Sequence, residues 1–188
     1  MGFHTFDADR ADKLEEAGKR YRFLSAEELL WALSPSDDDH VADFGSGTGF
    51  FTDDVAPHVD TVHAVDVQEA MHDYYRAKGV PDNVELVTSG VGDLPLATGS
   101  LDGAFSTMTY HEFASDDALA EIARVLKSDG TLAIVDWAAS GDGRYGPPVD
   151  ERFTAEEAVD ALREAGFTVT HEAVRPETFL LTATAPAE

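Results

Sequence analysis

The sequence predicts an α/β protein whose mostly parallel sheet is covered by helices on both faces. Between residues 40 and 166, apolar strand-like segments alternate with segments of helical periodicity, which is typical of a parallel sheet with right-handed crossovers. The first strand leads directly into a glycine-rich turn, Gly45-Ser46-Gly47-Thr48-Gly49. The last two strand-like segments are separated only by Arg175-Pro176-Glu177, and such a short link favours an antiparallel hairpin.

The helices of this pattern have recognisable first and last residues. Two capping boxes, Ser25-Ala26-Glu27-Glu28 and Thr154-Ala155-Glu156-Glu157, predict helix starts. Pro35 and Gly166 end these two helices. Ser115 predicts another start, for a helix that ends at the turn 127–130. That helix presents its apolar residues at helical spacing, namely Leu119, Ile122 and Leu126. Further helical segments are expected at 10–20, 49–56 and 68–78.

Segments rich in β-branched and apolar residues predict the strands. They are a run that ends near Phe44, followed by 60–66, 83–88, 101–108, 131–137, 167–174 and 179–184. Residues 138–150 are rich in Gly and Pro and predict a long loop. With 188 residues and no internal repeat, the chain suits a single globular domain. We expect an N-terminal helical segment at 1–36, ahead of the main domain at 37–188.

Composition excludes several classes of function. The chain has 13 basic and 37 acidic residues and a net charge of −24, which disfavours nucleic-acid and anionic-membrane binding. Acidic residues that are spread along the whole chain are typical of a salt-adapted (halophilic) protein. The absence of cysteine excludes disulfides and thiolate chemistry. No apolar run approaches a membrane span, and the N-terminus lacks a signal-like apolar region, so we expect a cytoplasmic protein.

The glycine-rich turn predicts a nucleoside-binding site. Glycine allows positive φ and close approach of a ligand to the backbone. Dinucleotide sites use G-x-G-x-x-G, whereas Gly49 comes one residue early. Asp43 precedes the turn, and Asp66 ends the second strand, where its carboxylate suits both ribose hydroxyls. No Lys or Arg stands nearby to bind phosphates, so a nucleoside is favoured, and no Gly-Lys-Ser/Thr is present to form a P-loop.

These motifs resemble those of class I S-adenosylmethionine-dependent methyltransferases across nearly the whole chain. Val41 to Gly49 resembles the family's first motif, Val65-Asp66 its second-strand acid, and Gly92-Asp93-Leu94-Pro95-Leu96 its adenine-contacting loop. Residues 123–130 resemble the turn before the fifth strand, with Ser128 and Asp129 as departures. A closer similarity, to small prokaryotic members related to the ubiquinone/menaquinone type, lies in four further stretches: His4-Thr5-Phe6-Asp7, Tyr110-His111-Glu112, Val135-Asp136-Trp137 and Gly146-Pro147-Pro148.

The resemblance implies a Rossmann-like doubly wound sheet of seven strands with the last strand antiparallel. It implies S-adenosyl-L-methionine as the cofactor. The N-terminal segment 1–36 precedes the sheet, and we expect it to lie over the cofactor as a lid. Met71 either packs on the adenine or belongs to the helix core. The expected cofactor-binding residues are Asp43, Phe44, Gly45, Ser46, Gly47, Gly49, Asp66, Val67, Met71, Gly92, Asp93, Leu94 and Thr107.

The acceptor site is expected at the carboxyl ends of the strands, next to the cofactor. His111 is the candidate base, since its ordinary pKa is near neutral pH; a structural histidine is the alternative. Glu112 either assists catalysis and binds a cationic acceptor or faces solvent at a helix start. Tyr110, Trp137 and Tyr145 are the candidate substrate-binding residues.

The sequence favours a small molecule as the binding partner of this protein. We expect a small-molecule acceptor, no nucleic acid and no membrane, with monomer and homodimer both open. No metal is expected, because the spacing of His4, His111 and Glu112 gives no metal motif. Two alternatives remain: a catalytically silent S-adenosylmethionine-binding or regulatory protein, and a nucleotide-dependent oxidoreductase.

Overall fold

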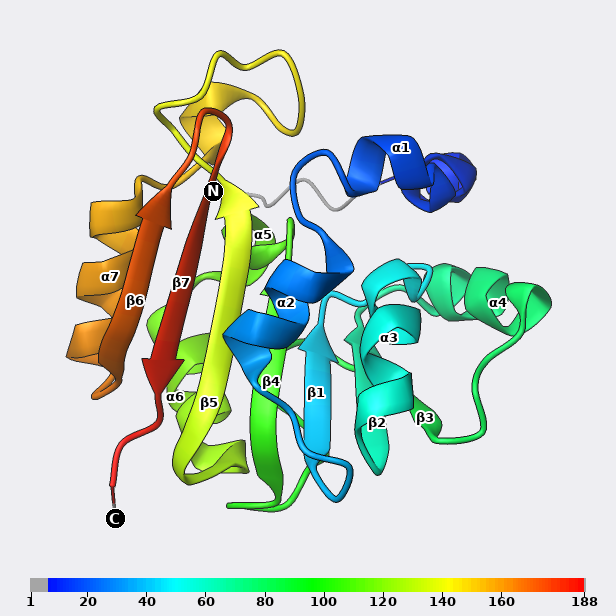
Figure 1. Cartoon of the computed structure of the whole chain (residues 1–188), viewed down its shortest axis with the longest axis horizontal. Helices are drawn as coiled ribbons and strands as arrows, with labels where there is room; N and C mark the ends of the chain where they lie inside the picture. The colour runs from blue at the N-terminus through cyan, green and yellow to red at the C-terminus, as the bar shows by residue number, and fades with distance from the viewer. Residues whose placement is uncertain (1–6, 188) are drawn as a thin grey trace.

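Seven strands form one sheet in the order β3-β2-β1-β4-β5-β7-β6 (Figure 1). The computed structural model describes residues 7–187, so Phe3, His4 and Phe6 lie outside the described residues. The strands are β1 (His40–Phe44), β2 (Thr61–Asp66), β3 (Val84–Thr88), β4 (Leu101–Thr107), β5 (Leu126–Trp137), β6 (Thr168–Val174) and β7 (Thr178–Thr184). The first five pair in parallel, and β7 runs antiparallel to both β5 and β6. The expected sheet and C-terminal hairpin are confirmed.

Helices cover both faces of the sheet because neighbouring strand residues point to opposite sides. In β1, Val41 packs with α2 (Ala26–Leu33), α3 (Phe50–Val55) and α4 (Glu69–Lys78). Ala42 packs with the other face, which carries α5 (Tyr110–Phe113), α6 (Asp116–Val125) and α7 (Ala155–Glu164). The remaining helical turns are η1 (Ala8–Glu15), α1 (Ala17–Arg20), η2 (Ala56–His58) and η3 (Val149–Glu151).

The expected helix caps are present. Ser25 accepts a hydrogen bond from the N–H of Glu28 at 3.1 Å, and Ser115 accepts from Ala118 at 3.2 Å. Thr154 and Glu157 form a complete capping box. These bonds satisfy backbone donors that have no partner inside the helix. Each cap fixes where its helix begins.

Three local expectations differ from the structure. The fifth strand begins at Leu126 rather than at residue 131, because Leu126 has extended backbone, pairs with Leu101 and is buried between strands. The turn at 127–130 therefore lies within β5, where Asp129 has a positive φ of 64°. Residues 10–20 form the short turns η1 and α1 rather than one helix. α5 was not expected from the sequence.

The carboxyl ends of β1, β4 and β5 meet at one edge of the sheet, at the top of Figure 1. The η1–α1 segment and the 138–150 loop lie at this same edge. Parallel α/β sheets bind ligands at the carboxyl ends of their strands. Within residues 7–187, no helix is both long and apolar enough to cross a membrane.

Candidate cofactor and acceptor site

The glycine turn after β1 has the backbone that its sequence requires. Gly45, Gly47 and Gly49 have φ values of 78°, 53° and 78°, a region that side-chain-bearing residues rarely adopt. A Cβ on Gly45 would collide with Thr109, and one on Gly49 would collide with the ring of Tyr75. The outer two glycines therefore allow close packing under the turn.

Asp66 holds the turn in place. Its Oδ2 accepts a hydrogen bond from the N–H of Gly47 at 2.8 Å, and its Oδ1 accepts one from the N–H of Gln68 at 2.8 Å. The N–H groups of Gly45 and Ser46 both donate to the carbonyl of Val65 at 2.9 Å. The second-strand acid thus fixes the loop, and its carboxylate also lines a cavity beside the loop.

Asp43 lies beneath the turn and does not line that cavity. Its Oδ2 accepts from Thr52 Oγ1 at 2.7 Å, whereas its Oδ1 is buried without a hydrogen-bond partner among the described residues. Burial raises the pKa of Asp43 to about 7, against the opposing effects of the Thr52 bond and the Arg20 charge, while Asp66 raises it further. Asp43 therefore links β1 to Thr52 of α3, and its pKa responds to the charge of Arg20.

Arg20 connects α1 to this loop. Burial lowers the pKa of the guanidinium to about 10, while Asp43 and Glu15 act to raise it. The guanidinium carbon lies 4.9 Å from the ring centroid of Phe51, in cation–π geometry. A positive charge from the N-terminal segment thus lies close to the buried Asp43.

The cofactor cavity, as we call it, lies between the glycine turn, the end of β2 and the start of α4. Its volume is about 140 Å³. Ser46 Oγ, Met71 and Thr107 are part of its wall, and Ser46 Oγ is buried without a partner in the part of the chain that the structure describes. Its lining is Leu14, Arg20, Gly45, Ser46, Gly47, Thr48, Phe50, Val65, Asp66, Val67, Gln68, Met71, Ser89, Val91, Thr107, Met108, Thr109, Glu112 and Phe113.

The donor set of this cavity fits a nucleoside. Asp66 offers carboxylate oxygens for ribose hydroxyls, Ser46 offers an unused hydroxyl, and Met71 and Val91 offer apolar surface for a base. No P-loop sequence accompanies them. Arg20 also lines the cavity, in contrast to the expectation that no Lys or Arg lies nearby, and its guanidinium packs over the ring of Phe51. The cavity is small for a whole nucleoside ligand, but it continues into a larger one.

The acceptor cavity, as we call it, has a volume of about 590 Å³. Leu14, Arg20, Met108 and Glu112 line both cavities. The rest of its wall consists of aromatic, basic, acidic and proline side chains: Asp7, Arg10, Lys13, Lys19, Phe23, Phe51, His111, Trp137, Tyr145, Gly146, Pro147, Pro148 and Glu151. A ligand in one cavity would therefore be adjacent to a ligand in the other.

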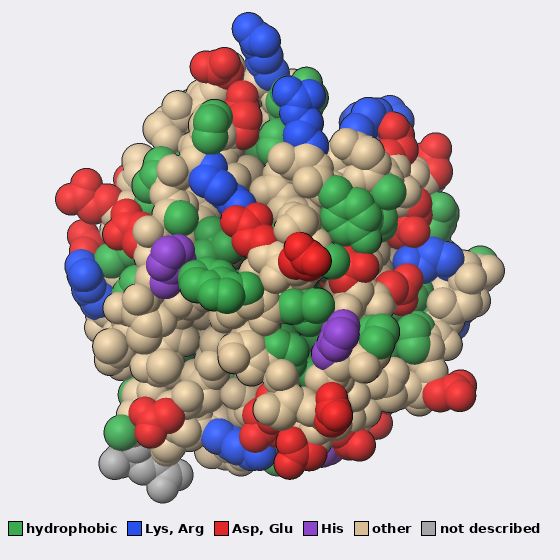
Figure 2. Space-filling model, viewed as in Figure 1, with side chains coloured by type: hydrophobic (Ala, Val, Ile, Leu, Met, Phe, Trp, Pro, Cys, Tyr) green, Lys and Arg blue, Asp and Glu red, His purple; other side chains and the backbone are tan. Residues whose placement is uncertain are grey.

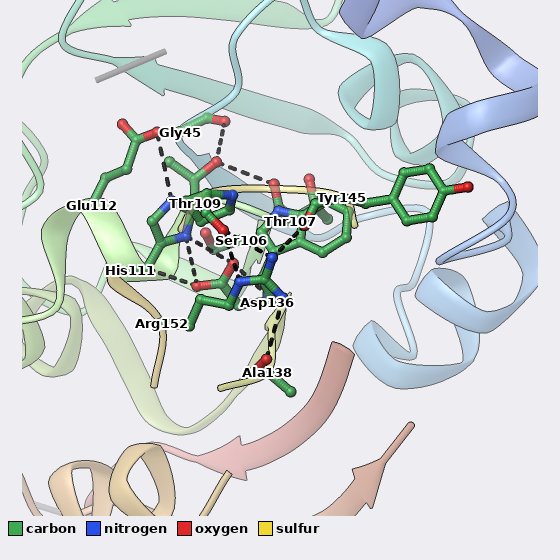
Figure 3. A network of polar contacts seen from close by, with 12 residues as sticks. Gly45, Ser106, Thr107, Thr109, His111, Glu112, Asp136, Ala138, Tyr145 and Arg152 are labelled. Atoms are coloured by element: carbon green, nitrogen blue, oxygen red, sulfur yellow. Dashed lines mark hydrogen bonds and ion pairs between the residues drawn. The ribbon is translucent and has the colours of Figure 1, made fainter. Parts of the chain in front are cut away.

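His111 is held by Asp136, the penultimate residue of β5, beside the start of α5 (Figure 3). The backbone N–H of His111 donates to Asp136 Oδ2 at 2.6 Å, and Nδ1 lies 3.0 Å from both carboxylate oxygens. A carboxylate only accepts, so Nδ1 carries the hydrogen and Nε2 has the free lone pair. Nε2 lies 3.9 Å from Glu112 Oε1.

The pKa of His111 reflects opposing effects. Burial lowers it, but the hydrogen bond and charge of Asp136, with the charges of Glu112 and Glu151, outweigh burial and raise the pKa above its ordinary value. His111 therefore binds a proton more tightly than a free imidazole, and it does so beside the cavity where an acceptor would lie.

Arg152 fastens the 138–150 loop over the acceptor cavity. Its side chain is fully buried and donates to the carbonyls of Pro147, Ala138 and Tyr145. Gly146 packs so closely on the indole of Trp137 that a Cβ there would collide with the ring. These contacts position Tyr145 beside Phe23, with ring centroids 5.2 Å apart.

The structure brings most of the expected site residues together. The cofactor cavity includes Gly45, Ser46, Gly47, Asp66, Val67, Met71, Thr107 and Glu112, and the acceptor cavity includes His111, Glu112, Trp137 and Tyr145.

Other expected residues lie elsewhere. Phe44 is in the core, Gly49 packs on Tyr75, and Tyr110 is buried against Phe113 and Phe153. Gly92, Asp93 and Leu94 are not part of the cavity wall, because the loop turns Asp93 to solvent and Leu94 into the core. Ser89 and Val91, one turn earlier, line it instead.

Sequence reasoning did not assign roles to Asp136, Arg20 or Thr109. The sequence does contain a pattern that indicates a role for Asp136, because it is an acid near the end of an apolar strand, as Asp66 is. It contains no such pattern for Arg20, since this residue lies in a charged segment whose packing depends on the whole fold.

Comparisons with known proteins agree with this geometry. A family profile described as a methyltransferase domain matches residues 42–134. An uncharacterized methyltransferase-like protein of Schizosaccharomyces pombe is 33% identical over 132 residues, which cover 70% of this chain and 50% of that protein. The O-methyltransferase cnsE of Penicillium expansum is 29% identical over 181 residues, covering 87% of this chain and 63% of that protein. The chain thus spans less than two thirds of either curated relative.

Among solved structures, a SAM-dependent methyltransferase from Aquifex aeolicus superposes with a TM-score of 0.87 at 29% identity, covering 96% of this chain and all of that one. Together with the glycine turn, Asp66 and the sheet order, these matches establish the family and its cofactor. The chain belongs to the class I S-adenosylmethionine-dependent methyltransferases, and its cofactor is S-adenosyl-L-methionine.

Proposed function

We propose that the chain transfers a methyl group to a hydroxyl of a small-molecule acceptor bound in the acceptor cavity, with His111 as the base. The observation that carries this proposal is the pairing of His111 with Asp136 at the wall of a cavity that adjoins the cofactor cavity. A cavity of about 590 Å³ has the size of small-molecule sites. The similarity to an O-methyltransferase, cnsE, supports an oxygen acceptor.

The residues of the cofactor cavity hold and orient the cofactor. The glycine turn brings the backbone close to the ligand, Asp66 binds the ribose hydroxyls, and Met71 and Val91 pack against the base. When bound, S-adenosyl-L-methionine supplies a methyl group already activated by a positive sulfur, so the protein has mainly to position the acceptor. The described part of the N-terminal segment, from residue 7 onward, acts as the lid, since Leu14 and Arg20 belong to the wall of both cavities.

His111 accepts the proton of the acceptor hydroxyl. Asp136 holds Nδ1–H, which would leave Nε2 to take the proton of the acceptor hydroxyl. The hydroxyl oxygen would gain the methyl group as the sulfur–carbon bond breaks, and S-adenosylhomocysteine would be the leaving group. Asp136 also stabilises the imidazolium that results. Trp137, Tyr145 and the loop fastened by Arg152 exclude water from this step.

Two measurements test the proposal. Calorimetry with S-adenosylhomocysteine should show saturable binding, and a library of hydroxylated small molecules should yield S-adenosylhomocysteine release at high salt. His111→Ala should abolish release and leave cofactor binding intact. Cofactor binding with no release from any acceptor would favour the silent binding protein, and stronger stabilisation by NAD than by S-adenosylmethionine would favour the oxidoreductase.

A further inference from the structure

A third cavity shares part of its wall with the acceptor cavity. Its volume is also about 590 Å³, and Phe23 and Tyr145 line both. We call it the arginine cavity, because three arginines stand in its wall. The wall consists of Tyr21, Arg22, Phe23, Leu24, Ser25, Glu28, Asp142, Arg144, Tyr145, Arg175, Pro176, Glu177 and Thr178.

Two of these arginines lack a full set of charged or hydrogen-bonding partners. Arg22 Nη1 donates to the phenol oxygen of Tyr145 at 3.0 Å, and its guanidinium lies 4.9 Å from the Tyr145 ring, so both contacts are with a neutral group. Arg175 Nη1 donates to Glu28 Oε1 at 2.7 Å. Its Nε and Nη2 are buried with no hydrogen-bond partner within the described residues. A buried donor without a partner is costly.

Two of the three acids in the same wall form ion pairs. Glu28 pairs with Arg175, and Glu177 Oε2 lies 3.7 Å from Nη1 of Arg152 but is buried without a hydrogen-bond partner among the described residues. Asp142 is the third acid of the wall. When the pairs Glu28–Arg175 and Glu177–Arg152 are left out, the wall keeps two basic residues, Arg22 and Arg144, and one acid, Asp142. This balance differs from that of the whole protein, whose net charge is −24.

Basic residues are concentrated at this end of the molecule. Seven of the thirteen Lys and Arg residues line the acceptor or the arginine cavity, four in the first and three in the second. Figure 2 shows Lys and Arg side chains gathered along the upper part of the molecule, where Figure 1 places α1 and the 138–150 loop. The same two walls also hold six acids, namely Asp7, Glu28, Glu112, Asp142, Glu151 and Glu177, so these cavities are close to charge balance in a chain of 13 basic and 37 acidic residues. They are therefore more favourable to an anion than the strongly acidic chain as a whole.

We infer that the methyl acceptor is an elongated anion whose carboxylate or phosphate binds in the arginine cavity. Its apolar body lies against Phe23, Trp137 and Tyr145, and its hydroxyl lies beside His111. Guanidinium groups bind carboxylate and phosphate through paired N–H donors. This inference rests on the proposed function for the identity of the ligand, but the anion site itself is testable without turnover.

The first test titrates inorganic phosphate, and separately acetate, into the ¹⁵N-labelled protein at constant ionic strength while the arginine Nε–H signals are followed. Arg22 and Arg175 should show saturable shifts, and Arg22→Gln should weaken the response of Arg175 about tenfold, the effect of one lost charge-assisted hydrogen bond. Arg163, exposed on α7 and paired with Asp160, is the internal control. Shifts at Arg22 and Arg175 no larger than at Arg163 would overturn the inference. Comparing the two anions tells phosphate from carboxylate.

The second test compares acceptors in matched pairs, such as 4-hydroxycinnamate and its primary amide. Acids should be methylated in preference to amides. Arg22→Gln and Arg175→Gln should each raise KM for the acids about tenfold or more with a smaller effect on kcat, and Arg163→Gln should change neither. Equal turnover of amides would refute the inference while leaving the proposed function intact. Absence of release from every compound would count against the proposed function, and the phosphate titration would still decide the anion site.

Discussion

His111 and Asp136 are joined at both the backbone and the side chain. The N–H of His111 lies 2.6 Å from Asp136 Oδ2, and its Nδ1 lies 3.0 Å from both carboxylate oxygens. One carboxylate at the end of β5 thus fixes both the start of α5 and the orientation of the imidazole. Asp136 is fully buried, and its Oδ1 also accepts a hydrogen bond from the N–H of Trp137 at 2.8 Å. A single substitution that keeps the shape of this side chain therefore tests the relationship.

Asp136→Asn should reduce kcat about 10²-fold, since general acid–base catalysis contributes on that order or more. Asp136 raises the pKa of His111, so its removal should move the midpoint of the pH–rate profile to lower pH even as the maximum falls. Affinity for S-adenosylhomocysteine should stay the same. A profile with an unshifted midpoint would contradict the role of Asp136 in setting the basicity of His111.

Asp66→Ala should weaken cofactor binding by about 1.5–3 kcal/mol for each lost hydrogen bond to the ribose. Asp66 also accepts from Gly47 and Gln68, so part of the loss would come from a looser turn. Asp66→Asn keeps an acceptor and should lose less. Exposed Asp82→Ala is the matched control. Calorimetry showing equal affinity for Asp66→Ala and the control would remove Asp66 from the site.

The sheet could be predicted from the sequence because its signals are local. Strand composition, capping residues and the glycine turn each act within a few residues, so β1, β2 and the Thr154 cap were all correctly located. The start of β5 was not, since Leu126 fits either the apolar face of a helix or an extended strand. Its pairing with Leu101, 25 residues away in sequence, decides between them.

The candidate site was only partly predictable for the same reason. Gly47 and Asp66 lie at strand ends, where topology alone brings them together. Arg20 and Phe23 reach the cavities through packing of the N-terminal segment, which no local pattern encodes. Asp93 is the opposite case, because a motif places it at the cofactor whereas its side chain is exposed and outside the cavity wall.

Asp43 should make stability depend on pH when no cofactor is bound. Its folded pKa of about 7 lies above its ordinary value of 3.8, so between these pH values the folded state holds a proton that the unfolded state has released. The contribution to the free energy of unfolding therefore falls as pH rises through this window, by on the order of 4 kcal/mol. Asp43→Asn should gain stability relative to wild type between pH 5 and pH 8.

Urea unfolding at the two pH values measures this difference. Asp38→Asn removes the same formal charge at an exposed site and should show no such pH dependence. A wild-type-minus-Asp43→Asn difference that is constant with pH would show that Asp43 has an ordinary pKa in the folded protein.

The net charge of −24 should make stability depend on salt. Repulsion among surface acids is screened as the Debye length falls from about 10 Å at 0.1 M to about 3 Å at 1 M. We expect Tm to rise between 0.1 M and 2 M KCl by several times the increase produced by sucrose of equal osmolality. Equal increases would mean that water activity rather than charge screening is responsible, and would argue against salt adaptation.

Arg152→Met should loosen the 138–150 loop and weaken acceptor binding more than cofactor binding. Methionine retains much of the apolar stem but donates no hydrogen bond, so the carbonyls of Pro147 and Ala138 lose their partner. Tyr145 would then lose its fixed position between the acceptor and arginine cavities. KM for the acceptor should rise about tenfold while the Kd for S-adenosylhomocysteine changes little, because no residue of the loop lines the cofactor cavity. Arg163→Met on α7 is the control for loss of a surface arginine. A parallel loss of both affinities would show that Arg152 stabilises the whole domain rather than the acceptor side of the site.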